Sequence, residues 1–362
     1  MRKNSHLYAV ILAGGAGTRL WPRSRKTRPK QLLEIVSSKT MIQETVERLG
    51  PLVDENHTIV VVGNIHFEEI ERQLAHVPSE NILIEPEGKN TAPAIGLAAI
   101  YLNARDENAV MLVLPSDHLI TNENRFRKTV KAGVRFAQKE KKLVTIGIQP
   151  TFPETGYGYI QTGQKQESVD GEDIYQVVAF HEKPTVATAK KFLSSGEYLW
   201  NSGMFIWSVQ TILDQIKMHL PDLYEGLMKI ESAIGKESEE KTVEKIYTSL
   251  QPESIDFGIM EKSKDVVLLK GDFGWNDIGS WAAMEQIWPK DENSNFLDAK
   301  VISIESTGNI IHSTRKLVAV IGLEDIVIIE TEDALLVCRK DRAPDVRRVV
   351  EELKKRGLDD YL

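Results

Sequence analysis

Glycines and basic side chains in residues 9–33 are grouped in a way that suits phosphate binding. An apolar run ends in a glycine loop, and a series of cations follows: Gly14, Gly15, Gly17, Arg19, Arg23, Arg25, Lys26, Arg28 and Lys30. Glycine lets the backbone approach an anion with its N–H groups pointing inward, and nearby cations neutralise phosphoryl oxygens. We therefore predict a polyphosphate site, in which Arg19 and Lys30 hold the β- and γ-phosphates and stabilise the leaving pyrophosphate.

Two other kinds of glycine loop do not fit the spacing. The dinucleotide fingerprint G-x-G-x-x-G, started at Gly15, requires a third glycine where Leu20 stands. The P-loop form requires G-K-[ST] after the glycines, and that sequence does not follow. A nicotinamide-dependent oxidoreductase is thus a distant alternative. The remaining cations, Arg23, Arg25, Lys26 and Arg28, are either phosphate contacts or a solvated basic face.

Two aspartates far apart in the sequence are candidate metal ligands. Asp117 follows a buried type of strand, and Asp277 lies on a polar loop. If both carboxylates reach one crevice, they form an oxygen site for Mg²⁺, which prefers one or two carboxylates together with phosphate oxygens and water. The alternative is that each aspartate caps a helix that follows it.

A loop after another predicted strand carries candidates for recognition of the nucleotide base. The carboxylate of Glu85 can accept two hydrogen bonds from the N1–H and N2–H₂ edge of guanine, whereas adenine presents a lone pair at N1. A loop glutamate that faces water is the alternative. Asn90 and Thr91 are either nucleotide contacts or helix caps.

A second group of residues suits a sugar phosphate. Lys183 lies between a predicted strand and a proline, where its cation can meet a phosphate, and Glu182 and Asn201 have the polar side chains that a hexose needs. The glycine and aromatic loop Gly156, Tyr157 and Gly158 can approach the sugar hydroxyls closely. Each of these residues taken alone could be structural.

The first 150 residues alternate between apolar strand-like runs and helical patterns. The runs cover residues 8–12, 58–62, 82–84, 109–114 and 143–148. Thr40 and Gln43 form a capping box before one helical pattern, and Pro93 lies in the first turn of another. This alternation predicts an α/β fold with a doubly wound, mostly parallel, Rossmann-like sheet, whose ligands bind beyond the carboxyl ends of the strands.

The pattern changes after residue 150. Residues 151–207 are predicted to be an insertion that contributes the sugar-binding groups, with strands at 175–180 and 204–207. The polar segment 289–295 is interpreted as a linker, and short apolar runs between 300 and 339 predict a small β-helix-like unit, followed by a terminal helix. We expect a catalytic domain at 1–288 and a C-terminal domain at 295–362 that packs or forms a dimer.

Composition limits the class of protein. The chain has 362 residues, a net charge of −8 and a single cysteine, Cys338. The acidic balance argues against a nucleic-acid surface, and the lone cysteine suits a reducing compartment. No apolar run approaches the ~18 residues that span a bilayer, and residues 1–6 lack a signal-peptide core. We expect a cytoplasmic protein without nucleic-acid or membrane partners.

Several of these motifs together resemble the mannose-1-phosphate guanylyltransferases, a branch of the sugar-1-phosphate nucleotidyltransferases. The resemblance covers residues 8–285 and rests on segments that occur in the same order: GGAGTRLWPRSR with PKQ, EPEGKNTAPAI, LPSDH, ETGYGYI, FHEKP, EYLWNSGMF, SIDFGIMEK and GWNDIGSW. Lys89 departs from the arginine that the family usually has before N-T-A-P-A, which puts a bidentate contact there in doubt.

The resemblance implies an activity and a set of roles. The activity is the transfer of GMP from GTP to mannose 1-phosphate, which gives GDP-mannose and pyrophosphate with Mg²⁺ as cofactor, in a protein that we expect to be a homodimer. The implied nucleotide contacts are Ala13, Gly14, Gly15, Gly17, Thr18 and Arg19, the metal ligands are Asp117 and Asp277, and the sugar-phosphate ligands are Glu182, Lys183 and Asn201. Because the chain stops after the small β unit, no isomerase activity is expected.

The sequence leaves two alternative functions open. One is the same chemistry on another sugar 1-phosphate or another nucleoside triphosphate. The other is a non-catalytic relative that senses nucleotide sugars, although such a protein is expected to lose metal ligands or cations that this chain keeps.

Overall fold

The computed structural model describes residues 5–15 and 17–362. Contacts among these residues divide them into two compact units. The described part of unit 1 consists of residues 5–14, 46–116 and 120–275, and unit 2 consists of 15, 17–45, 117–119 and 276–362. The units do not follow the predicted boundary at 288–295, because the glycine-loop segment and residues 276–288 pack with the C-terminal β unit. The predicted domains stay a prediction.

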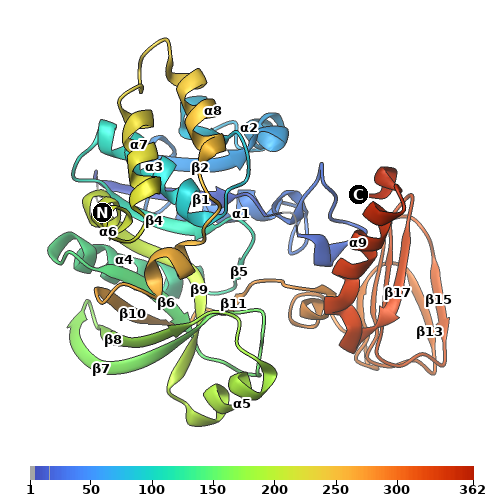
Figure 1. The fold of residues 1–362 in the computed structure, drawn as a ribbon. Helices are drawn as coiled ribbons and strands as arrows, with labels where there is room; N and C mark the ends of the chain where they lie inside the picture. The colour runs from blue at the N-terminus through green and yellow to red at the C-terminus, as the bar shows by residue number, and fades with distance from the viewer. Residues whose placement is uncertain (1–4, 16) are drawn as a thin grey trace. The chain divides into compact units, whose positions relative to one another are not determined.

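A nine-stranded mixed sheet forms the centre of the described part of unit 1 (Figure 1). Its strand order is β3-β2-β1-β4-β9-β6-β10-β8-β7. The strands β3, β2, β1 and β4 pair in parallel, as do β6 and β10, whereas β9 runs antiparallel to both β4 and β6. The bounds are β1 Leu7–Ala13, β2 Thr58–Gly63, β3 Ile82–Glu85, β4 Val110–Pro115, β6 Leu143–Ile148, β7 Tyr159–Val169, β8 Glu172–His181, β9 Tyr198–Ser208 and β10 Val266–Gly271.

The five strands predicted in the first 150 residues are confirmed within one residue. The strands predicted at 175–180 and 204–207 are longer, because β8 begins three residues and β9 six residues earlier. β1 and β4 are buried along nearly their whole length, as expected for central strands that are covered on both faces. Two short strands, β5 (Leu119–Ile120) and β11 (Trp275–Asn276), pair with each other and were not predicted. β7 was also not predicted, because most of its residues are polar and partly or fully exposed.

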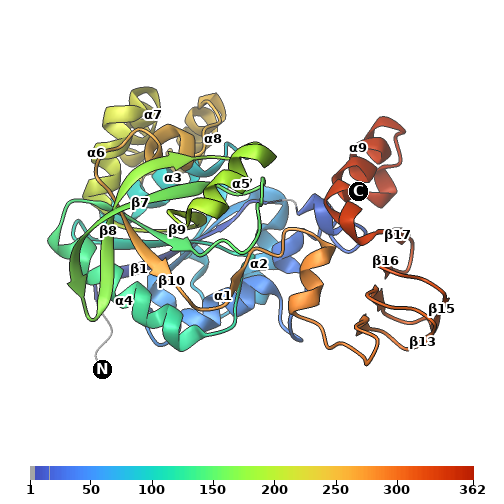
Figure 2. The same ribbon diagram turned by 90° about the horizontal axis from the view of Figure 1, so that it is seen from below.

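Helices cover both sides of the sheet, so the doubly wound fold is confirmed. Helices α3, α6, α7 and α8 gather on one side, and α4 lies on the other (Figures 1 and 2). Their apolar side chains, such as Ile95, Ile212 and Leu227, are completely buried in the core of unit 1. The bounds are α1 Met41–Leu49, α2 Phe67–Gln73, α3 Thr91–Arg105, α4 Glu123–Lys139, α6 Val209–His219, α7 Pro221–Glu231 and α8 Glu239–Ser249.

Local capping explains where two of these helices begin. The backbone N–H of Thr40 donates to Oε1 of Gln43 at 3.0 Å, so the predicted capping box opens α1. The side chain of Asn122 accepts a hydrogen bond from the N–H of Arg125 at 3.0 Å and caps α4. Within residues 5–15 and 17–362, every helix is too short or too polar to cross a membrane.

The predicted insertion is built on an antiparallel hairpin. β7 and β8 pair along most of their length, and β7 also pairs with β9 (Figure 2). Helix α5 (Val186–Ser195) follows β8, and the hydroxyl of Thr185 caps it by accepting from the N–H of Thr188. This arrangement places the loop before β7, the end of β8 and the strand β9 in one part of unit 1.

The C-terminal part of unit 2 is a small β unit, as predicted. β12 (Phe296–Asp298), β14 (Ile310–Ser313) and β16 (Ile326–Glu330) form a parallel ladder, and β13 (Val301–Ile304) pairs in parallel with β15 (Val318–Ile321). Parallel strands stacked at short intervals along the chain are typical of a β-helix coil. β17 (Leu335–Arg339) adds an antiparallel edge to β16, and α9 (Arg347–Lys355) follows it.

Tryptophans join the glycine-loop segment to the C-terminal β unit. The indole N–H of Trp281 donates to the carbonyl of Trp21 at 2.9 Å, and that of Trp288 donates to the carbonyl of Ile35 at 3.2 Å. The indole N–H of Trp21 donates in turn to the carbonyl of Tyr361 at 2.8 Å. The packing role expected for the C-terminal part therefore includes support of the segment that carries the predicted phosphate contacts.

Candidate active site

Gly17 and Lys30 are in direct contact in unit 2. Gly17 has a φ of 60°, which favours glycine, and a Cβ at this position would overlap Cβ of Lys30. The carbonyl of Gly17 accepts hydrogen bonds from the N–H of Leu20 at 3.0 Å and from the hydroxyl of Ser24 at 2.7 Å. The loop thus has a fixed shape, in which Thr18 is partly exposed and Arg19 is exposed. The backbone and Cβ of Lys30 pack against Gly17.

Lys30 joins the two predicted metal ligands. Its ammonium group lies 2.8 Å from Oδ2 of Asp117 and also donates to the backbone carbonyl of Asp277. The Lys30 side chain is only 7% exposed, so these contacts are shielded from water. The structure therefore brings together three sequence-predicted residues that are separated by up to 247 positions along the chain.

The charge of Asp117 is set by its neighbours. Burial alone would raise the pKa of its carboxyl group, but the ammonium of Lys30 and the ring of His118 lower it, and the pKa lies below its usual range as a result. Asp117 is therefore ionised at neutral pH. An ionised carboxylate is the oxygen ligand that Mg²⁺ prefers.

Neither aspartate is a helix cap, which was the alternative left open by the sequence. The helix after Asp117 is capped by Asn122, and the 3₁₀ helix after Asp277, Trp281–Gln286, has Ser280 at its N-cap. The Asp277 carboxylate stands over Gly279, where a Cβ would lie only 2.9 Å from Oδ2. The local sequence N-D-I-G thus holds the carboxylate over a glycine backbone.

The other cations of the glycine-loop segment have structural partners. Arg23 donates to the carbonyl of Glu34 at 2.7 Å, and burial lowers its pKa. Arg25 donates to the carbonyl of Pro22 and pairs with Asp333 at 2.8 Å. These contacts favour the structural alternative for both arginines.

Glu85 lies at the end of β3 in a buried setting. It is 6% exposed, and the hydroxyl of Tyr247 in α8 donates to its Oε1. Burial raises the pKa of the carboxyl group, and the Tyr247 hydroxyl acts in the opposite direction. Its second oxygen faces Gly14, where a Cβ would lie 3.6 Å away. The alternative of a solvated loop glutamate is therefore excluded.

Asn90 and Thr91 make structural hydrogen bonds. The Asn90 side chain accepts from the N–H of Thr91 at 2.8 Å and caps α3, and the Thr91 hydroxyl accepts from the N–H of Ile255 at 2.8 Å. The first bond favours the cap alternative for Asn90, whereas the Thr91 hydroxyl makes a tertiary contact with Ile255. Lys89, which replaces the family arginine, is 8% exposed and pairs with Glu87 at 2.9 Å.

The loop before β7 is held by its own side chains. The N–H of Gly156 donates to Glu154 at 2.7 Å, and the Tyr157 ring packs edge-on against Trp200 and Trp275 with centroid separations of 5.2 and 5.4 Å. The carbonyl of Gly158 accepts a hydrogen bond from the N–H of Asn201 at 2.8 Å. The loop is thereby fixed beside β9.

Lys183 and Glu182 follow β8 directly. Lys183 has a φ of 45°, and its N–H donates to the carbonyl of Tyr157 at 3.2 Å. The Lys183 side chain is 62% exposed and its ammonium group lies 3.0 Å from Oε1 of Glu182, which is itself largely buried. An exposed cation beside a fixed loop is available to an anionic ligand.

Asp256, which was not predicted from the sequence as a site residue, lies next to these residues. The amide of Asn201 donates to Oδ1 of Asp256 at 2.9 Å. Asp256 opens a π-helical turn, Asp256–Met260, and such turns are rare and concentrated at functional sites. The segment SIDFGIMEK carried the only signal in the sequence, and only through the resemblance.

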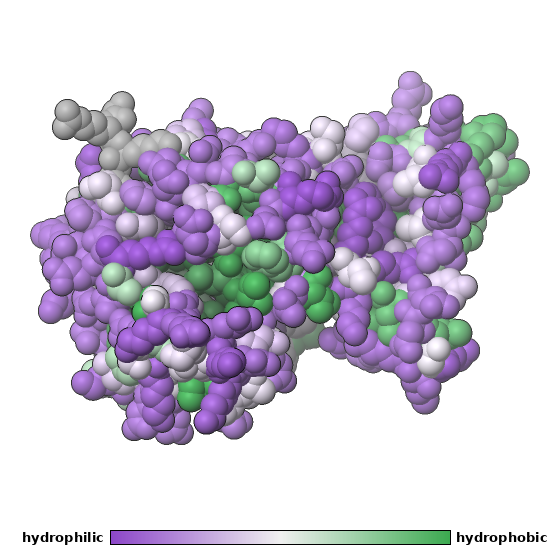
Figure 3. Space-filling view, turned by 90° about the horizontal axis from the view of Figure 1, so that it is seen from above, coloured by the Kyte–Doolittle hydropathy of each residue, from purple (hydrophilic) through white to green (hydrophobic). Residues whose placement is uncertain are grey.

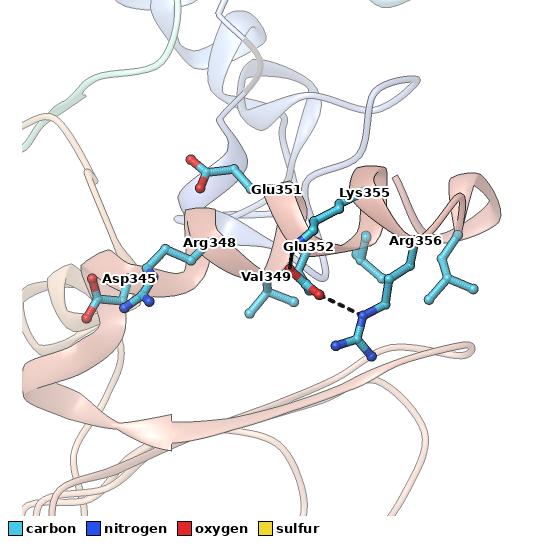
Figure 4. A pocket seen from close by; sticks show the side chains of 9 residues that line it. Asp345, Arg348, Val349, Glu351, Glu352, Lys355 and Arg356 are labelled. Carbon is cyan, nitrogen blue, oxygen red and sulfur yellow. Dashed lines mark hydrogen bonds and ion pairs between the residues drawn. The ribbon is translucent and has the colours of Figure 1, made fainter.

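A surface hollow on α9 contains none of the predicted site residues (Figure 4). Its charged side chains pair with each other: Arg356 lies 2.8 Å and Lys355 lies 3.8 Å from the carboxylate of Glu352. Such ion pairs between neighbouring turns are typical of a solvent-exposed helix face.

Comparison with known proteins gives the same class as the fold and these residues. The family described as nucleotidyl transferase matches residues 8–294, and the family described as the MannoseP isomerase/GMP-like beta-helix domain matches residues 299–353. The fold, with its glycine loop at the end of β1, is therefore that of a nucleotidyltransferase joined to a β-helix unit.

Individual relatives narrow the class further. The chain is 39% identical to a mannose-1-phosphate guanylyltransferase of Escherichia coli over 99% of this chain and 78% of the relative, and 40% identical to one of Klebsiella pneumoniae over 98% and 75%. A crystal structure described as mannose-1-phosphate geranyltransferase from Thermus thermophilus superposes with a TM-score of 0.86 at 34% identity, covering 96% of this chain and 99% of that chain. The chain belongs to the mannose-1-phosphate guanylyltransferase family.

Proposed function

We propose that the protein transfers GMP from GTP to α-D-mannose 1-phosphate and releases pyrophosphate. A phosphate oxygen of the sugar phosphate forms a bond to the α-phosphorus of GTP in line, while the bond from that phosphorus to the bridging oxygen of pyrophosphate breaks. The observation that carries the proposal is that the Lys30 ammonium group contacts both the carboxylate of Asp117 and the backbone carbonyl of Asp277, which brings the two aspartates to one cation.

The cations have distinct roles in this reaction. Arg19 and Lys30 contact the β- and γ-phosphates and stabilise the charge of the leaving pyrophosphate, and Lys183 contacts the phosphate of the sugar. The contacts to the leaving pyrophosphate strengthen as charge develops on it, and the loss of one such contact typically lowers the rate by ~10²- to 10³-fold. The nucleophile is already an anion, so no covalent enzyme intermediate is required.

Asp117 and Asp277 would hold Mg²⁺. Two carboxylates, one of them kept ionised by Lys30, form the hard oxygen donor set that this ion takes together with phosphate oxygens. When bound, the ion supplies positive charge to the phosphates and polarises the α-phosphorus. The Asp117 carboxylate would then be shared between the Lys30 ammonium group and the metal ion.

Base selection falls to Glu85. Its Oε1 is occupied by the Tyr247 hydroxyl, and the remaining carboxylate lone pairs accept from the guanine edge. A buried site of this kind rejects a base that lacks the donors, because the carboxylate would remain unpaired. Asn90 supports this region as the cap of α3, and Thr91 supports it through its hydrogen bond with Ile255.

We also propose a homodimer in the reducing cytoplasm, which the single cysteine suits. Hydrophobic surface gathers on the C-terminal β unit (Figure 3), where several apolar side chains of its strands are half exposed or more: Ile302, Ile304, Leu317, Ile321, Leu335 and Val337. Exposed apolar side chains that lie close together support association. Sedimentation equilibrium would give twice the chain mass, and a monomer at micromolar concentration would refute the dimer.

Pyrophosphate release tests the proposed reaction. The protein is supplied with Mg²⁺ and every pairing of GTP, ATP, UTP or dTTP with mannose 1-phosphate or glucose 1-phosphate. GTP with mannose 1-phosphate is expected to give the highest kcat/KM, with GDP-mannose as the co-product. No release with any pair would refute the activity, and a preference for UTP or dTTP would refute the role of Glu85.

A further inference from the structure

Arg19 lies in a single turn of 3₁₀ helix, Thr18–Leu20. The N–H of Trp21 donates to the carbonyl of Thr18 at 3.4 Å and closes the turn. A turn this short has too few internal hydrogen bonds to hold its own geometry. The Arg19 side chain is exposed, so packing does not fix it directly. The placement of its guanidinium group therefore depends on what holds the residues next to it.

Trp21, which ends this turn, is anchored at two points. Its carbonyl accepts from the indole N–H of Trp281 at 2.9 Å, and its own indole N–H donates to the carbonyl of Tyr361 at 2.8 Å. Trp21 is 7% exposed and Trp281 is completely buried. The loss of one partner of a buried hydrogen bond is unfavourable, because the other partner stays unpaired. Both the backbone and the side chain of Trp21 are thus held in place.

Apolar packing reinforces these two bonds. Leu20 and Trp21 belong to a buried cluster that also contains Ile278 and Trp281. Ile278 directly follows Asp277 in the sequence. The same cluster therefore holds the residues that end the 3₁₀ turn and the residue next to one predicted metal ligand.

Arg25 gives the segment a further attachment. Its Nε donates to the carbonyl of Pro22 at 2.6 Å, and its guanidinium group lies over the Trp21 ring, 5.7 Å from the centroid. The same group pairs at 2.8 Å with Asp333, which lies between β16 and β17. Three separate segments of unit 2, those of Trp281, Asp333 and Tyr361, thus converge on Trp21 and its neighbours.

We propose that Trp21 is a positioning residue, which holds the turn that carries Arg19 where its guanidinium group meets the phosphates of the nucleotide. This inference rests on the proposed function, because it takes Arg19 to be a phosphate contact. Trp21 is buried and acts only through the backbone that it fixes. Stabilisation of charge by a cation depends on its placement, so a small displacement of the turn weakens the hold on pyrophosphate. The sugar phosphate, which Arg19 does not contact, is little affected.

Two substitutions remove the two anchors separately. W21F removes the indole donor to Tyr361 but keeps an aromatic ring in the cluster, and W281F removes the donor to the Trp21 carbonyl without changing the loop itself. For each variant we expect kcat/KM for GTP to fall about 10-fold, whereas KM for mannose 1-phosphate changes less than about twofold. The dissociation constant of inorganic pyrophosphate, measured by calorimetry without turnover, should rise about fivefold.

W288F is the matched control. Trp288 also donates its indole N–H to a backbone carbonyl, that of Ile35, at 3.2 Å, and it packs in the same cluster. Ile35 lies outside the turn that carries Arg19. W288F and W21F should lower the thermal midpoint by similar amounts, of about 2–4 °C. Only W21F should lower kcat/KM for GTP, so the comparison separates positioning from stability.

A double-mutant cycle with Arg19 provides a readout that a purely structural role would not move. R19Q removes the cation itself. In that background W21F should lower kcat/KM for GTP by less than about twofold, because no guanidinium group remains to be misplaced. Additive effects of R19Q and W21F would mean that Trp21 does not act through Arg19.

The outcomes distinguish this inference from the proposed function. If the unsubstituted protein makes GDP-mannose while W21F and W281F both retain kcat/KM for GTP, Trp21 does not position Arg19. An equal loss of kcat/KM in W288F would also overturn the inference. If the unsubstituted protein makes no nucleotide sugar, the proposed function fails, and the pyrophosphate affinities of W21F and W288F still test the placement of Arg19: equal affinities would refute it.

Discussion

Asp117 and Asp256 are both shielded carboxyl groups, but their neighbours have opposite charges. Asp117 lies 2.8 Å from the Lys30 ammonium group, and its pKa is lowered despite its burial. Asp256 lies near the Glu182 carboxylate, and burial with this neighbour raises its pKa to about 7. The first carboxyl group is ionised at neutral pH, and the second keeps its proton up to near neutral pH. Burial alone does not decide the charge of a carboxyl group; the neighbour does.

The largest expected effect comes from removing either carboxylate of the Lys30 set. D277A and D117A should lower kcat with Mg²⁺ by about 10³-fold or more, because the metal loses half of its protein ligands. D277A keeps the backbone carbonyl that Lys30 bonds, and its thermal midpoint should be close to that of the control D214A, which removes an exposed carboxylate of α6. D117A should have a lower midpoint, because it leaves the buried Lys30 ammonium group without its carboxylate partner. Pyrophosphate release measures the rate. Near-normal rates at saturating Mg²⁺ would show that Asp117 and Asp277 are not metal ligands.

Replacing the cation itself tests the Asp117 side of the comparison. K30M should lower kcat by about 10²- to 10³-fold through loss of a phosphate contact. It should also raise the pKa of Asp117, so the acidic limb of the activity profile should move to higher pH. K131M, which changes an exposed lysine of α4, is the control. An acidic limb at the same pH in K30M would mean that Lys30 does not set the charge of Asp117.

A third carboxyl group, Glu85, has a hydroxyl rather than a charge as its neighbour. Y247F removes the hydroxyl that orients it, and the preference for GTP over ATP in kcat/KM should fall by about tenfold. Y101F is the matched control, because its hydroxyl donates to another carboxylate, Glu239, at 2.6 Å. Unchanged base preference in Y247F would show that the Tyr247 bond serves packing only.

The smallest effect concerns stability and follows from the raised pKa of Asp256. Folding raises this pKa above its unfolded value, so the folded protein binds more protons between about pH 4 and 7, and its stability falls as pH rises through that window. D256N carries no such charge. Its advantage in thermal midpoint should grow from pH 5 to 7 and reach about 2–4 °C. Calorimetry at pH 5, 7 and 8 measures it, and a constant difference would contradict the raised pKa.

The sequence predicted the elements whose signal is local. Buried parallel strands such as β1 and β4 appear as continuous apolar runs, and the capping box of Thr40 and Gln43 marks the start of α1. β7 has no such run, and helices α6, α7 and α8 were not predicted. The positions of the three helices depend on packing against the sheet rather than on a local sequence signal.

The candidate site could be predicted only where residue type suggested chemistry. Asp117 and Asp277 were predicted as metal ligands and Lys30 as a phosphate contact, but the contacts among these residues form only on folding. The sequence left Asn90 and Thr91 open between two roles that only their hydrogen-bond partners could separate. Asp256 gave no local signal, because its contact with Asn201, 55 positions away, forms only on folding.

The most direct test of the contrast between the two aspartates is a measurement of their protonation. Carbon-13 NMR of protein labelled at aspartate carboxyl carbons, with D117N and D256N to assign the signals, gives the pKa of each group. Asp117 should stay ionised at every pH above ~4, and Asp256 should take up a proton near pH 7. Titration of both groups together near pH ~4 would contradict the account.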